Sequence, residues 1–431
     1  MRSVAAVVGV MLVLLTGLAP GALARSGSGP LPRLRHAPNS PAERSLTSGL
    51  NRGMRQSGRS SGAYVVDLTT GQTLYSHQIN TGRLPASVEK LYTTTTALQR
   101  FGAGGTLTTA VLGQGQMEGS TYVGTLYLRG GGDPTFGAAS FDASNYGTGA
   151  TIQQLVSNLV AATGMTAFRG KVVADETVFD SDRGTPATNN QPSTEVEGEL
   201  SGLAFDRGWY NLSGTVLDTH PALDAGLELV STLKAAGIHV LGRTPVSAAR
   251  TPAGLTPLAS VASPPMSTLL ALTLTPSDNF FAEMLLKDIG ARFGGGGTTA
   301  RGVTVVRSQI AHDFGIHPRF NDGSGLSRYD LTSPAQVMTL LRGMAGDTAF
   351  TNALAVAGET GTLQDEMRGT YAQGRCRGKT GTLSNVSNLV GYCQARDGHT
   401  LAYAILMNAI NPDYAHPIQD RMVEAVAKYA G

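Results

Sequence analysis

Lysine is scarce in this sequence: six of the 33 basic residues are lysines and the others are arginines. Arginine stays protonated in proteins, whereas a partly buried lysine can lose its proton and act as a base. A lysine in such a chain is a candidate for a role that arginine cannot fill. Two of the six, Lys90 and Lys379, lie in short motifs with other polar residues.

The signs of metal and nucleic-acid binding are also missing. The eight histidines are scattered, and there is no H-E-x-x-H sequence or Cys/His cluster with metal-ligand spacing. A net charge of +2 gives no reason to expect a nucleic-acid partner. We therefore expect no metal, no cofactor and no nucleic acid.

Long apolar runs are absent beyond the N-terminus. Residues 4–18 are apolar, follow Arg2 and precede the small-residue triplet 22–24. This pattern is typical of a secretory signal peptide. An uncleaved anchor is the alternative, although spanning a bilayer takes about 20 apolar residues. We expect a signal peptide over 1–24, a disordered leader over 25–41, and an exported chain without a transmembrane segment after cleavage.

The sequence has only two cysteines, Cys376 and Cys393. They flank a predicted turn near residues 383–386, so an antiparallel hairpin would place them opposite each other. An even cysteine count in an exported chain favours a disulfide. Two buried thiols on neighbouring strands are the alternative.

At 431 residues and 41% hydrophobic composition the chain can form two or three domains. Residues 63–68 and 73–76 predict a β-hairpin. Residues 107–256 contain short β-like runs with glycine-rich turns, and we interpret them as an inserted domain. Helical patterns are predicted at 87–101, 222–236, 267–274, 279–292, 304–314, 333–344 and 418–429.

The first motif is Ser87-Val88-Glu89-Lys90. Residues at i and i+3 share one face of a helix, so Ser87 and Lys90 can touch. A serine hydroxyl becomes a good nucleophile when a base takes its proton, and burial can lower the pKa of a lysine enough to serve. Alone, however, the pattern is common by chance.

The second motif, Ser277-Asp278-Asn279, offers a hydroxyl for proton relay and an amide for a substrate carbonyl, although an ordinary helix N-cap would look the same. The third, Lys379-Thr380-Gly381 followed by Thr382, combines a cation and hydroxyls that suit a carboxylate. Residues 374–380 are not a P-loop, because one residue is missing between the glycines and a strand follows. A Ser-His-Asp hydrolase is excluded, because no serine lies in G-x-S-x-G.

In this order, the three motifs are those of penicillin-binding proteins and class A β-lactamases. The chain resembles the D-alanyl-D-alanine carboxypeptidase/endopeptidase family of low-molecular-mass class C penicillin-binding proteins, peptidase family S13. Beyond the motifs, the shared stretches are residues 131–135, 172–175 with Phe179, 263–265, 322–328 and 361–363.

The resemblance implies an α/β (α+β) fold: a serine β-lactamase/transpeptidase-like domain, with an antiparallel sheet flanked by helices plus a helical subdomain, and an inserted β-rich domain. We assign residues 42–106 and 257–431 to the catalytic domain and 107–256 to the insertion. Between residues 205 and 221 the chain is much shorter than the longer members of this family, so we expect one inserted domain and not two.

The resemblance also implies the catalytic roles. Ser87 attacks the carbonyl between two D-alanines of a peptidoglycan stem peptide, Lys90 takes its proton, and Ser277 relays a proton to the leaving amine. Water then releases the acyl group. A β-lactam has a similar carbonyl and carboxylate, so penicillin should acylate Ser87.

Substrate-binding roles follow in the same way. Asn279 would hold the substrate backbone. The third motif would bind the terminal carboxylate, through Lys379, Thr380, Gly381 and Thr382. The backbone N–H groups of Ser87 and Thr382 would form the oxyanion hole.

Three further residues match positions that bind the diamino acid of the stem peptide in this family. Asp175 would hold its free amine and Arg328 its carboxylate, with Ser384 beside them. A zwitterionic diaminopimelate end needs one anion and one bidentate cation. Asp175 and Arg328 could instead merely stabilise loops.

Two other functions remain as alternatives. A serine β-lactamase-like hydrolase would need a base for deacylation, and the nearest candidate, Glu197-Gly198-Glu199-Leu200, lacks the following asparagine and precedes Ser277. A catalytically idle penicillin-binding scaffold protein would be acylated without turnover. The sequence does not separate carboxypeptidase from endopeptidase activity, and the oligomeric state is open.

Overall fold

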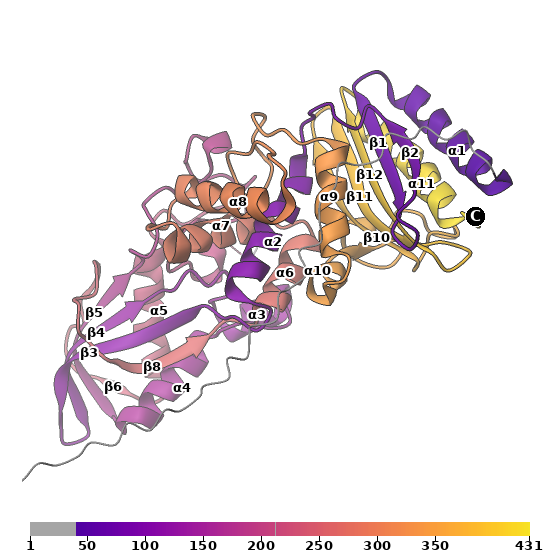
Figure 1. Ribbon diagram of the computed structural model, residues 1–431. Coiled ribbons are helices and arrows are strands. Elements are labelled where there is room, and N and C mark those ends of the chain that lie inside the picture. The colour runs from indigo at the N-terminus through magenta and orange to yellow at the C-terminus, as the bar shows by residue number, and fades with distance from the viewer. Residues whose placement is uncertain (1–39, 212) are drawn as a thin grey trace, which may run out of the picture. The chain divides into compact units, whose positions relative to one another are not determined.

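The computed structural model describes residues 40–211 and 213–431, which contain two β-sheets and the helices packed on them (Figure 1). The predicted signal peptide and nearly all of the predicted leader lie outside these residues. Within them, no helix has both the length and the apolar character needed to cross a membrane. All of the described residues belong to one compact unit.

The first sheet is antiparallel throughout, in the order β2-β1-β12-β11-β10-β9. Its strands are β1 (Ser61–Asp67), β2 (Thr73–His77), β9 (Ala355–Val356), β10 (Cys376–Leu383), β11 (Val386–Gln394) and β12 (Thr400–Asn408). The predicted hairpin is therefore confirmed as β1 and β2. Because β1 pairs with β12, strands from near the two ends of the chain complete one sheet.

The central strands of this sheet are buried on both faces. Side chains alternate along a strand, so Tyr64 and Val66 of β1 enter one core while Ala63 and Val65 enter the other. Strand β12 does the same over residues 401–407. This explains why both strands are nearly continuous apolar runs in the sequence, and helices must cover both faces.

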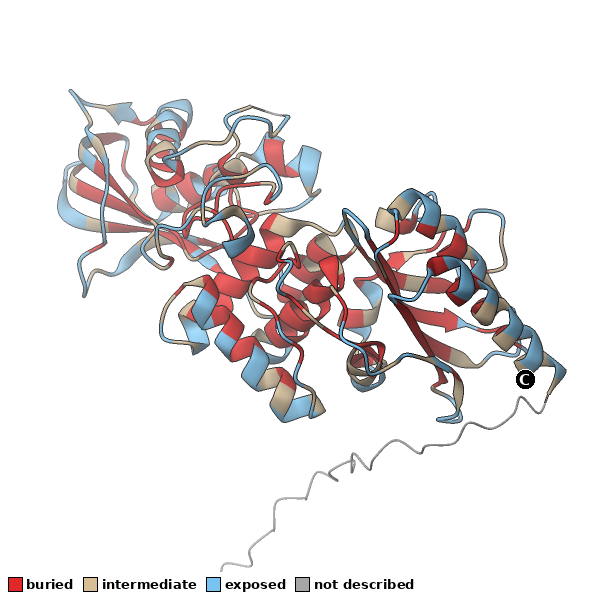
Figure 2. Ribbon diagram, turned by 90° about the horizontal axis from the view of Figure 1, so that it is seen from above, coloured by how far each residue is buried: buried red, intermediate tan, exposed pale blue. Residues whose placement is uncertain are grey.

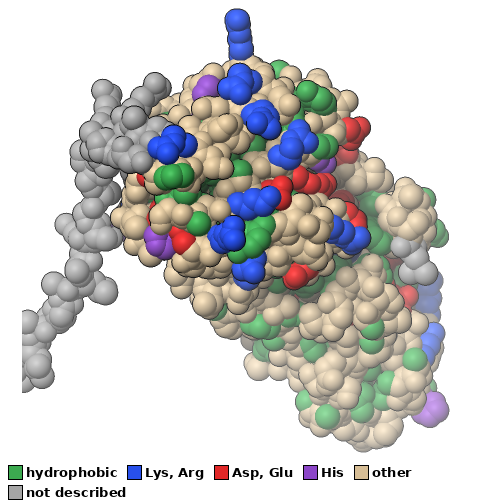
Figure 3. Space-filling view, turned by 90° about the vertical axis from the view of Figure 1, so that its right-hand side faces the viewer, with side chains coloured by type: hydrophobic (Ala, Val, Ile, Leu, Met, Phe, Trp, Pro, Cys, Tyr) green, Lys and Arg blue, Asp and Glu red, His purple; other side chains and the backbone are tan. Residues whose placement is uncertain are grey.

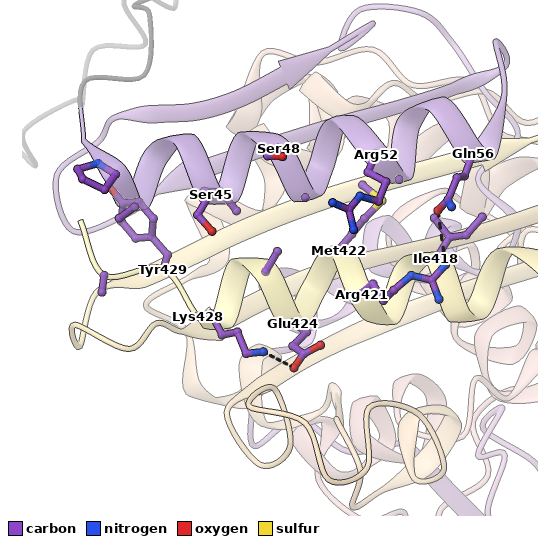
Figure 4. Close-up of a pocket in the computed structure, with 17 residues that line it drawn as sticks. Ser45, Ser48, Arg52, Gln56, Ile418, Arg421, Met422, Glu424, Lys428 and Tyr429 are labelled. Carbon is purple, nitrogen blue, oxygen red and sulfur yellow. Dashed lines mark hydrogen bonds and ion pairs between the residues drawn. The ribbon is translucent and has the colours of Figure 1, made fainter.

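Helices α1 (Pro41–Ser57) and α11 (Pro412–Ala427) pack together on one face of the sheet. Between them lies a groove of about 660 Å³, where Arg52, Gln56, Arg421 and the Lys428–Glu424 ion pair are seen (Figure 4). No residue of the three sequence motifs lines this groove.

Helices packed against the other face include those that carry the motifs. They are α2 (Lys90–Phe101), α6 (Met266–Leu274), α7 (Asn279–Phe293), α8 (Thr299–Phe314), α9 (Pro334–Met344) and α10 (Thr348–Asn352). Helices α8 and α11 begin five and six residues before the predicted starts at 304 and 418. The Thr298 side chain caps α8, and α11 continues through Pro417, where a helix is normally interrupted.

The second sheet has the order β6-β5-β4-β3-β8, with β7 paired to β5. Its strands are β3 (Thr108–Glu118), β4 (Thr121–Arg129), β5 (Ala167–Asp175), β6 (His239–Val240), β7 (Val246–Ala248) and β8 (Pro257–Ala262). Strand β8 begins just beyond the predicted end of the insertion at residue 256. Because β8 is an edge strand, Pro257 leaves the sheet intact.

Helices α3 (Ala139–Asn145) and α4 (Ile152–Thr163) connect the parallel pair β4 and β5, and α5 (Pro221–Ala235) follows β5. The apolar faces of α4 and α5 share one core with the sheet. The predicted β-rich segment is thus a mixed sheet with helices. Helix α4 was not predicted, although Thr151 caps it.

Buried residues concentrate in the strands and in the helices that pack on them (Figure 2). On the face drawn in Figure 3, acidic and basic side chains lie interspersed over the upper part, with fewer below. This mixture agrees with the small net charge of +2.

Candidate active site

The predicted helix at 87–101 begins as a separate 3₁₀ turn, Ala86–Glu89, followed by α2. Ala86 has a left-handed backbone, with φ 48°. The Asn388 side chain of β11 donates hydrogen bonds to the carbonyls of Leu84 (2.9 Å) and Pro85 (2.7 Å). The sheet therefore fixes the turn that presents Ser87, and this turn is not an ordinary helix start.

Strand β10 lies directly against this turn. A Cβ atom on Gly381 would be 2.5 Å from the Pro85 carbonyl oxygen and 3.1 Å from the Val88 nitrogen. Only a glycine allows so close an approach. The glycine of the third motif thus lets β10 pass beside Ser87, which is half-buried.

Lys90 is fully buried and its ammonium nitrogen is surrounded by three acceptors. Nζ donates hydrogen bonds to Ser87 Oγ (2.9 Å), Asn279 Oδ1 (2.6 Å) and the Ser324 carbonyl (2.9 Å). Burial lowers the pKa of Lys90 to about 8, although carboxylates such as that of Glu197 act in the opposite direction. Lys90 is thus positioned and tuned to exchange a proton with Ser87.

The second motif lies at the start of α7. Asp278 caps the helix by accepting a hydrogen bond from the Phe281 N–H (2.9 Å). Asn279 contacts Lys90 through Oδ1, and its Nδ2 donates to the Glu195 carbonyl (2.8 Å). Ser277 has a left-handed backbone, φ 69°, and no side-chain hydrogen bond to another described residue.

Glu197 is part of this arrangement, which sequence reasoning missed. It was considered only as a deacylating base, yet its Oε2 accepts a hydrogen bond from the Asn279 backbone N–H (2.8 Å). Burial and the nearby Asp278 carboxylate raise its pKa. Glu197 has a left-handed backbone, with φ 67°, and the sequence around a non-glycine residue does not reveal this conformation.

Lys379 of the third motif is fully buried in β10. Its Nζ donates to the Thr380 carbonyl (2.8 Å). Burial, with a further contribution from the charge of Lys90, lowers the pKa of Lys379 well below its ordinary value. An anion that bound here would restore the charged form.

Thr380 and Thr382 line a small cavity of about 150 Å³. Thr380 Oγ1 donates a hydrogen bond to Thr362 Oγ1 (2.8 Å), which lies in the 3₁₀ turn Gly361–Leu363. Thr382 is exposed. The Thr380 hydroxyl is therefore oriented by residues 361–363, one of the stretches shared with the family that the chain resembles.

A larger cleft of about 890 Å³ begins at Asn279, and we call it the Arg328 cleft. It is lined by Pro186, Ala187, Asn189, Thr194, Glu195, Glu197, Asn279, Asn321, Leu326, Ser327, Arg328, Tyr329, Leu383 and Ser384. Arg328 Nη2 donates to the Ser384 carbonyl (3.1 Å) and also to its hydroxyl. The structure thus brings together these two predicted substrate-binding residues.

Asp175 lies outside this cleft, so its role in binding the amine of the diamino acid stays a prediction. It ends β5, is 3% exposed and does not line the Arg328 cleft. Its Oδ1 accepts hydrogen bonds from the N–H and hydroxyl of Thr177, and its Oδ2 from the Thr251 N–H. Burial raises its pKa, but these hydrogen bonds outweigh burial and hold the pKa below the ordinary value. Asp175 therefore stabilises the loops after β5.

The predicted disulfide between Cys376 and Cys393 is confirmed. The two residues are direct partners in the β10–β11 register, with a Cα separation of 4.0 Å. Cys376 begins the strand that carries Lys379 three residues later. Among the described residues, no group of three or more His, Cys, Asp or Glu side chains is arranged to hold a metal ion.

Comparison with known proteins identifies the family of this chain. Residues 44–215 and 210–429 match the D-Ala-D-Ala carboxypeptidase 3 (S13) family. A D-alanyl-D-alanine carboxypeptidase of Actinomadura sp. (strain R39) is 31% identical over 87% of this chain and 82% of its own length. Carboxypeptidase DacB of Mycolicibacterium smegmatis is 28% identical over 81% of this chain and 76% of its own length.

The fold agrees with that of a solved structure. The crystal structure of penicillin binding protein 4 (dacB) from Haemophilus influenzae superimposes with a TM-score of 0.72 at 19% identity, covering 88% of this chain and 99% of the other. The family match covers nearly all of the described residues and includes all three motifs. The chain belongs to the S13 family of serine-type D-Ala-D-Ala carboxypeptidases.

Proposed function

We propose that this serine-type D-Ala-D-Ala carboxypeptidase uses Ser87 as its nucleophile and Lys90 as its general base. The observation that carries the proposal is the 2.9 Å contact between Nζ of the fully buried Lys90 and Oγ of the half-buried Ser87. A lysine whose pKa is lowered to about 8 has a neutral fraction near neutral pH that can accept the Ser87 proton.

The reaction then proceeds in two steps, acylation of Ser87 and hydrolysis of the resulting ester. Ser87 Oγ attacks the carbonyl carbon of the penultimate D-alanine of a peptidoglycan stem peptide, and its proton moves to Lys90. The C–N bond breaks, the terminal D-alanine leaves with a proton relayed through Ser277, and an ester remains on Ser87. Water hydrolyses the ester and restores the serine.

The other motif residues hold the reacting groups. The backbone N–H groups of Ser87 and Thr382 are assigned to the oxyanion. The substrate carboxylate is assigned to Lys379, Thr380 and Thr382, which lie on the strand that Gly381 allows to pass close to Ser87. The buried amine of Lys379, whose single hydrogen bond within the described residues is to a backbone carbonyl, supports this assignment, because a bound carboxylate would favour its charged form.

Covalent labelling tests the nucleophile. Fluorescent penicillin should form an ester with the wild type that survives denaturing electrophoresis, whereas Ser87→Ala should give no band. Ser277→Ala should label more slowly and keep its site, because it retains the nucleophile. Labelling of Ser87→Ala at the wild-type level would contradict the proposal. Far-ultraviolet circular dichroism is the control that shows the variant to be folded.

Two muropeptides separate the activities that a single acyl-enzyme can support. A monomeric pentapeptide that loses its terminal D-alanine reports carboxypeptidase activity, whereas a cross-linked dimer that is cut to monomers reports endopeptidase activity. Both use Ser87 and differ in the leaving amine. Acylation without turnover on either substrate would instead favour a penicillin-binding scaffold protein.

We also propose that the chain is exported after cleavage near residue 24. The Cys376–Cys393 disulfide supports an oxidising compartment. N-terminal sequencing of the protein from culture supernatant and cell envelope would locate the cut. The division into a catalytic domain and one inserted domain is likewise a proposal, with the insertion now extended through β8.

A further inference from the structure

Four buried carboxyl groups lie near Lys90 and do not line the Arg328 cleft. They are Glu89, Glu283, Asp322 and Asp330, each 0% exposed. None of them forms an ion pair with a described residue. They come from three places in the sequence: the turn that carries Ser87, helix α7, and the loop after residue 321.

Glu283 makes the contacts that reach the catalytic lysine. Its Oε1 accepts hydrogen bonds from the backbone N–H groups of Gly323 (2.9 Å) and Ser324 (2.8 Å). The carbonyl of Ser324 in turn accepts a hydrogen bond from Lys90 Nζ (2.9 Å). One oxygen of the Glu283 carboxyl group thus fixes the peptide segment whose carbonyl faces Lys90.

Helix α7 therefore holds Lys90 by two routes. Asn279, in its first turn, contacts Nζ directly at 2.6 Å. Glu283, one turn later on the same helix, acts through the loop. Asp322 reinforces that loop, because its two oxygens accept hydrogen bonds from the backbone N–H groups of Gly325 and Ser327, at 2.8 Å each.

The loop has little freedom to relax if Glu283 is changed. Gly325 has a left-handed backbone, φ 85°, and a Cβ atom there would lie 1.9 Å from the Ala86 carbonyl. The loop is thus packed directly against the residue before Ser87. A displaced Ser324 carbonyl would leave Lys90, whose long side chain has several rotatable bonds, with one acceptor fewer.

We propose that Glu283 is a positioning residue for acylation: it fixes the Ser324 carbonyl, and that carbonyl holds Lys90 Nζ against Ser87. The proposal rests on the roles proposed above for Ser87 and Lys90. It assigns no contact with substrate to Glu283, which is fully buried.

The pH dependence of acylation distinguishes this role from a general contribution to folding. The charged or titratable groups that face Lys90 are Glu89 of its own turn, Glu197 of the 195–197 segment, Asp278 and Glu283 of α7, Asp322 and Asp330 of the loop, and Lys379 of β10. Losing the Ser324 acceptor destabilises the ammonium form. The pKa of Lys90 should therefore fall further, and the limb on which acylation rises with pH should move to lower pH.

The experiment compares Glu283→Gln with Glu283→Asp, using the rate of penicillin acylation from pH 5 to 10. Glutamine keeps an oxygen at the same reach, so it should acylate within about threefold of the wild type. Aspartate is shorter, and a misplacement of about 1 Å can cost roughly 100-fold in rate. Asp288→Asn is the matched control, because Asp288 is a buried carboxyl on α7 that lies beside Gly132 and outside the active-site loop.

The expected result is a slow Glu283→Asp variant with its pH limb shifted to lower pH, rescue in Glu283→Gln, and an unshifted limb in Asp288→Asn. Equal losses in the Gln and Asp variants, or an unshifted limb in a slow Asp variant, would overturn the positioning role. The positioning role would also be overturned if Glu283→Asp did not fold and Glu283→Gln acylated more than about threefold more slowly than the wild type. Failure of the wild type to label at Ser87 would instead refute the proposed function.

Discussion

Arg207 binds Asp278 through two hydrogen bonds, from Nη1 to Oδ2 at 2.6 Å and from Nη2 to Oδ1 at 3.0 Å. The guanidinium is buried among the rings of Trp209, Phe280 and Phe281. Arg207 and Asp278 are 71 residues apart in the chain. This pair therefore ties the loop that carries Glu197 to the helix start that carries the second motif.

The first prediction concerns Arg207→Lys. Lysine keeps the charge but cannot form the planar two-bond pair or stack on the rings, so we expect a loss of about 2–4 kcal/mol in the free energy of unfolding. Acylation should also slow, because Asn279 follows Asp278 directly. Urea unfolding and penicillin labelling measure the two effects. Arg169→Lys is the control, since its pair with Glu118 is exposed and should contribute less than about 1 kcal/mol.

The second prediction concerns the disulfide. Replacing Cys376 and Cys393 by serine should reduce stability by about 3 kcal/mol, because the bond closes a loop with a sequence separation of 17. The folded variant should still be acylated, since β10 keeps its pairing with β9 and β11. Reductant should lower the urea midpoint of the wild type and leave the double variant unchanged. An unaffected wild-type midpoint would show that the bond does not stabilise the fold.

The third prediction is that Lys90→Arg lowers acylation by roughly 10²–10⁴-fold, the usual contribution of a general base. In the wild type, the rate should rise with pH up to about pH 8, because the neutral form of Lys90 becomes populated as pH approaches its lowered pKa. Lys234→Arg, at an exposed site on α5, is the matched control. Near wild-type acylation in Lys90→Arg would mean that the base has been wrongly assigned.

Local and pairwise features were readable from the sequence. Two β-like runs separated by a glycine-containing turn predicted the first hairpin, and the spacing of Cys376 and Cys393 about a turn predicted their register. The contact between Ser87 and Lys90 followed from their i, i+3 spacing. These features depend on short stretches of chain, where geometry is set by the backbone.

The supporting contacts of the site depend on distant segments and were not readable. Ser324 reaches Lys90 across 234 residues, and Glu197 reaches Asn279 across 82. Asn388 left one signal in the sequence: it is an amide within a largely apolar strand, and a buried amide must find hydrogen-bond partners. Asp175 matched a family position, but its Asp-x-Thr pattern also suits a local turn, and the structure contains that turn.

The fourth prediction concerns Glu89, whose buried carboxyl oxygens have no partner among the described residues. Burial, followed by the nearby Asp330 and Asp322 carboxylates, raises its pKa well above the ordinary 4.5. The folded protein therefore holds a proton that the unfolded chain releases, and the stability this provides is lost as pH rises from the unfolded pKa through the folded one.

Glutamine cannot ionise, so the stability of Glu89→Gln relative to the wild type should increase between pH 5 and pH 9. Urea unfolding at several pH values measures this difference. Glu359→Gln, at an exposed position, is the matched control. A constant difference across the range would show that Glu89 does not change protonation on unfolding.

The last prediction concerns Arg328, which lines its cleft together with Ser384 and hydrogen bonds to it. A guanidinium on the wall of an open cleft can bind a carboxylate through two parallel hydrogen bonds. A diaminopimelate stem carries such a carboxylate and a lysine-type stem does not. Arg328→Ala should therefore lower kcat/KM for diaminopimelate peptides by roughly 10–100-fold, the loss of about 1.4–2.8 kcal/mol expected for a charge-assisted pair.

The control substrate for this prediction is a bare diacetyl-lysyl-D-Ala-D-Ala peptide. It reaches Ser87 without presenting a carboxylate to Arg328, so its kcat/KM should remain within about twofold of the wild type, as should penicillin acylation. Asp175→Asn should not discriminate between the substrates, because Asp175 is buried outside the cleft. Equal losses on both peptides in Arg328→Ala would mean that Arg328 supports the segment at Ser384 and does not select the substrate.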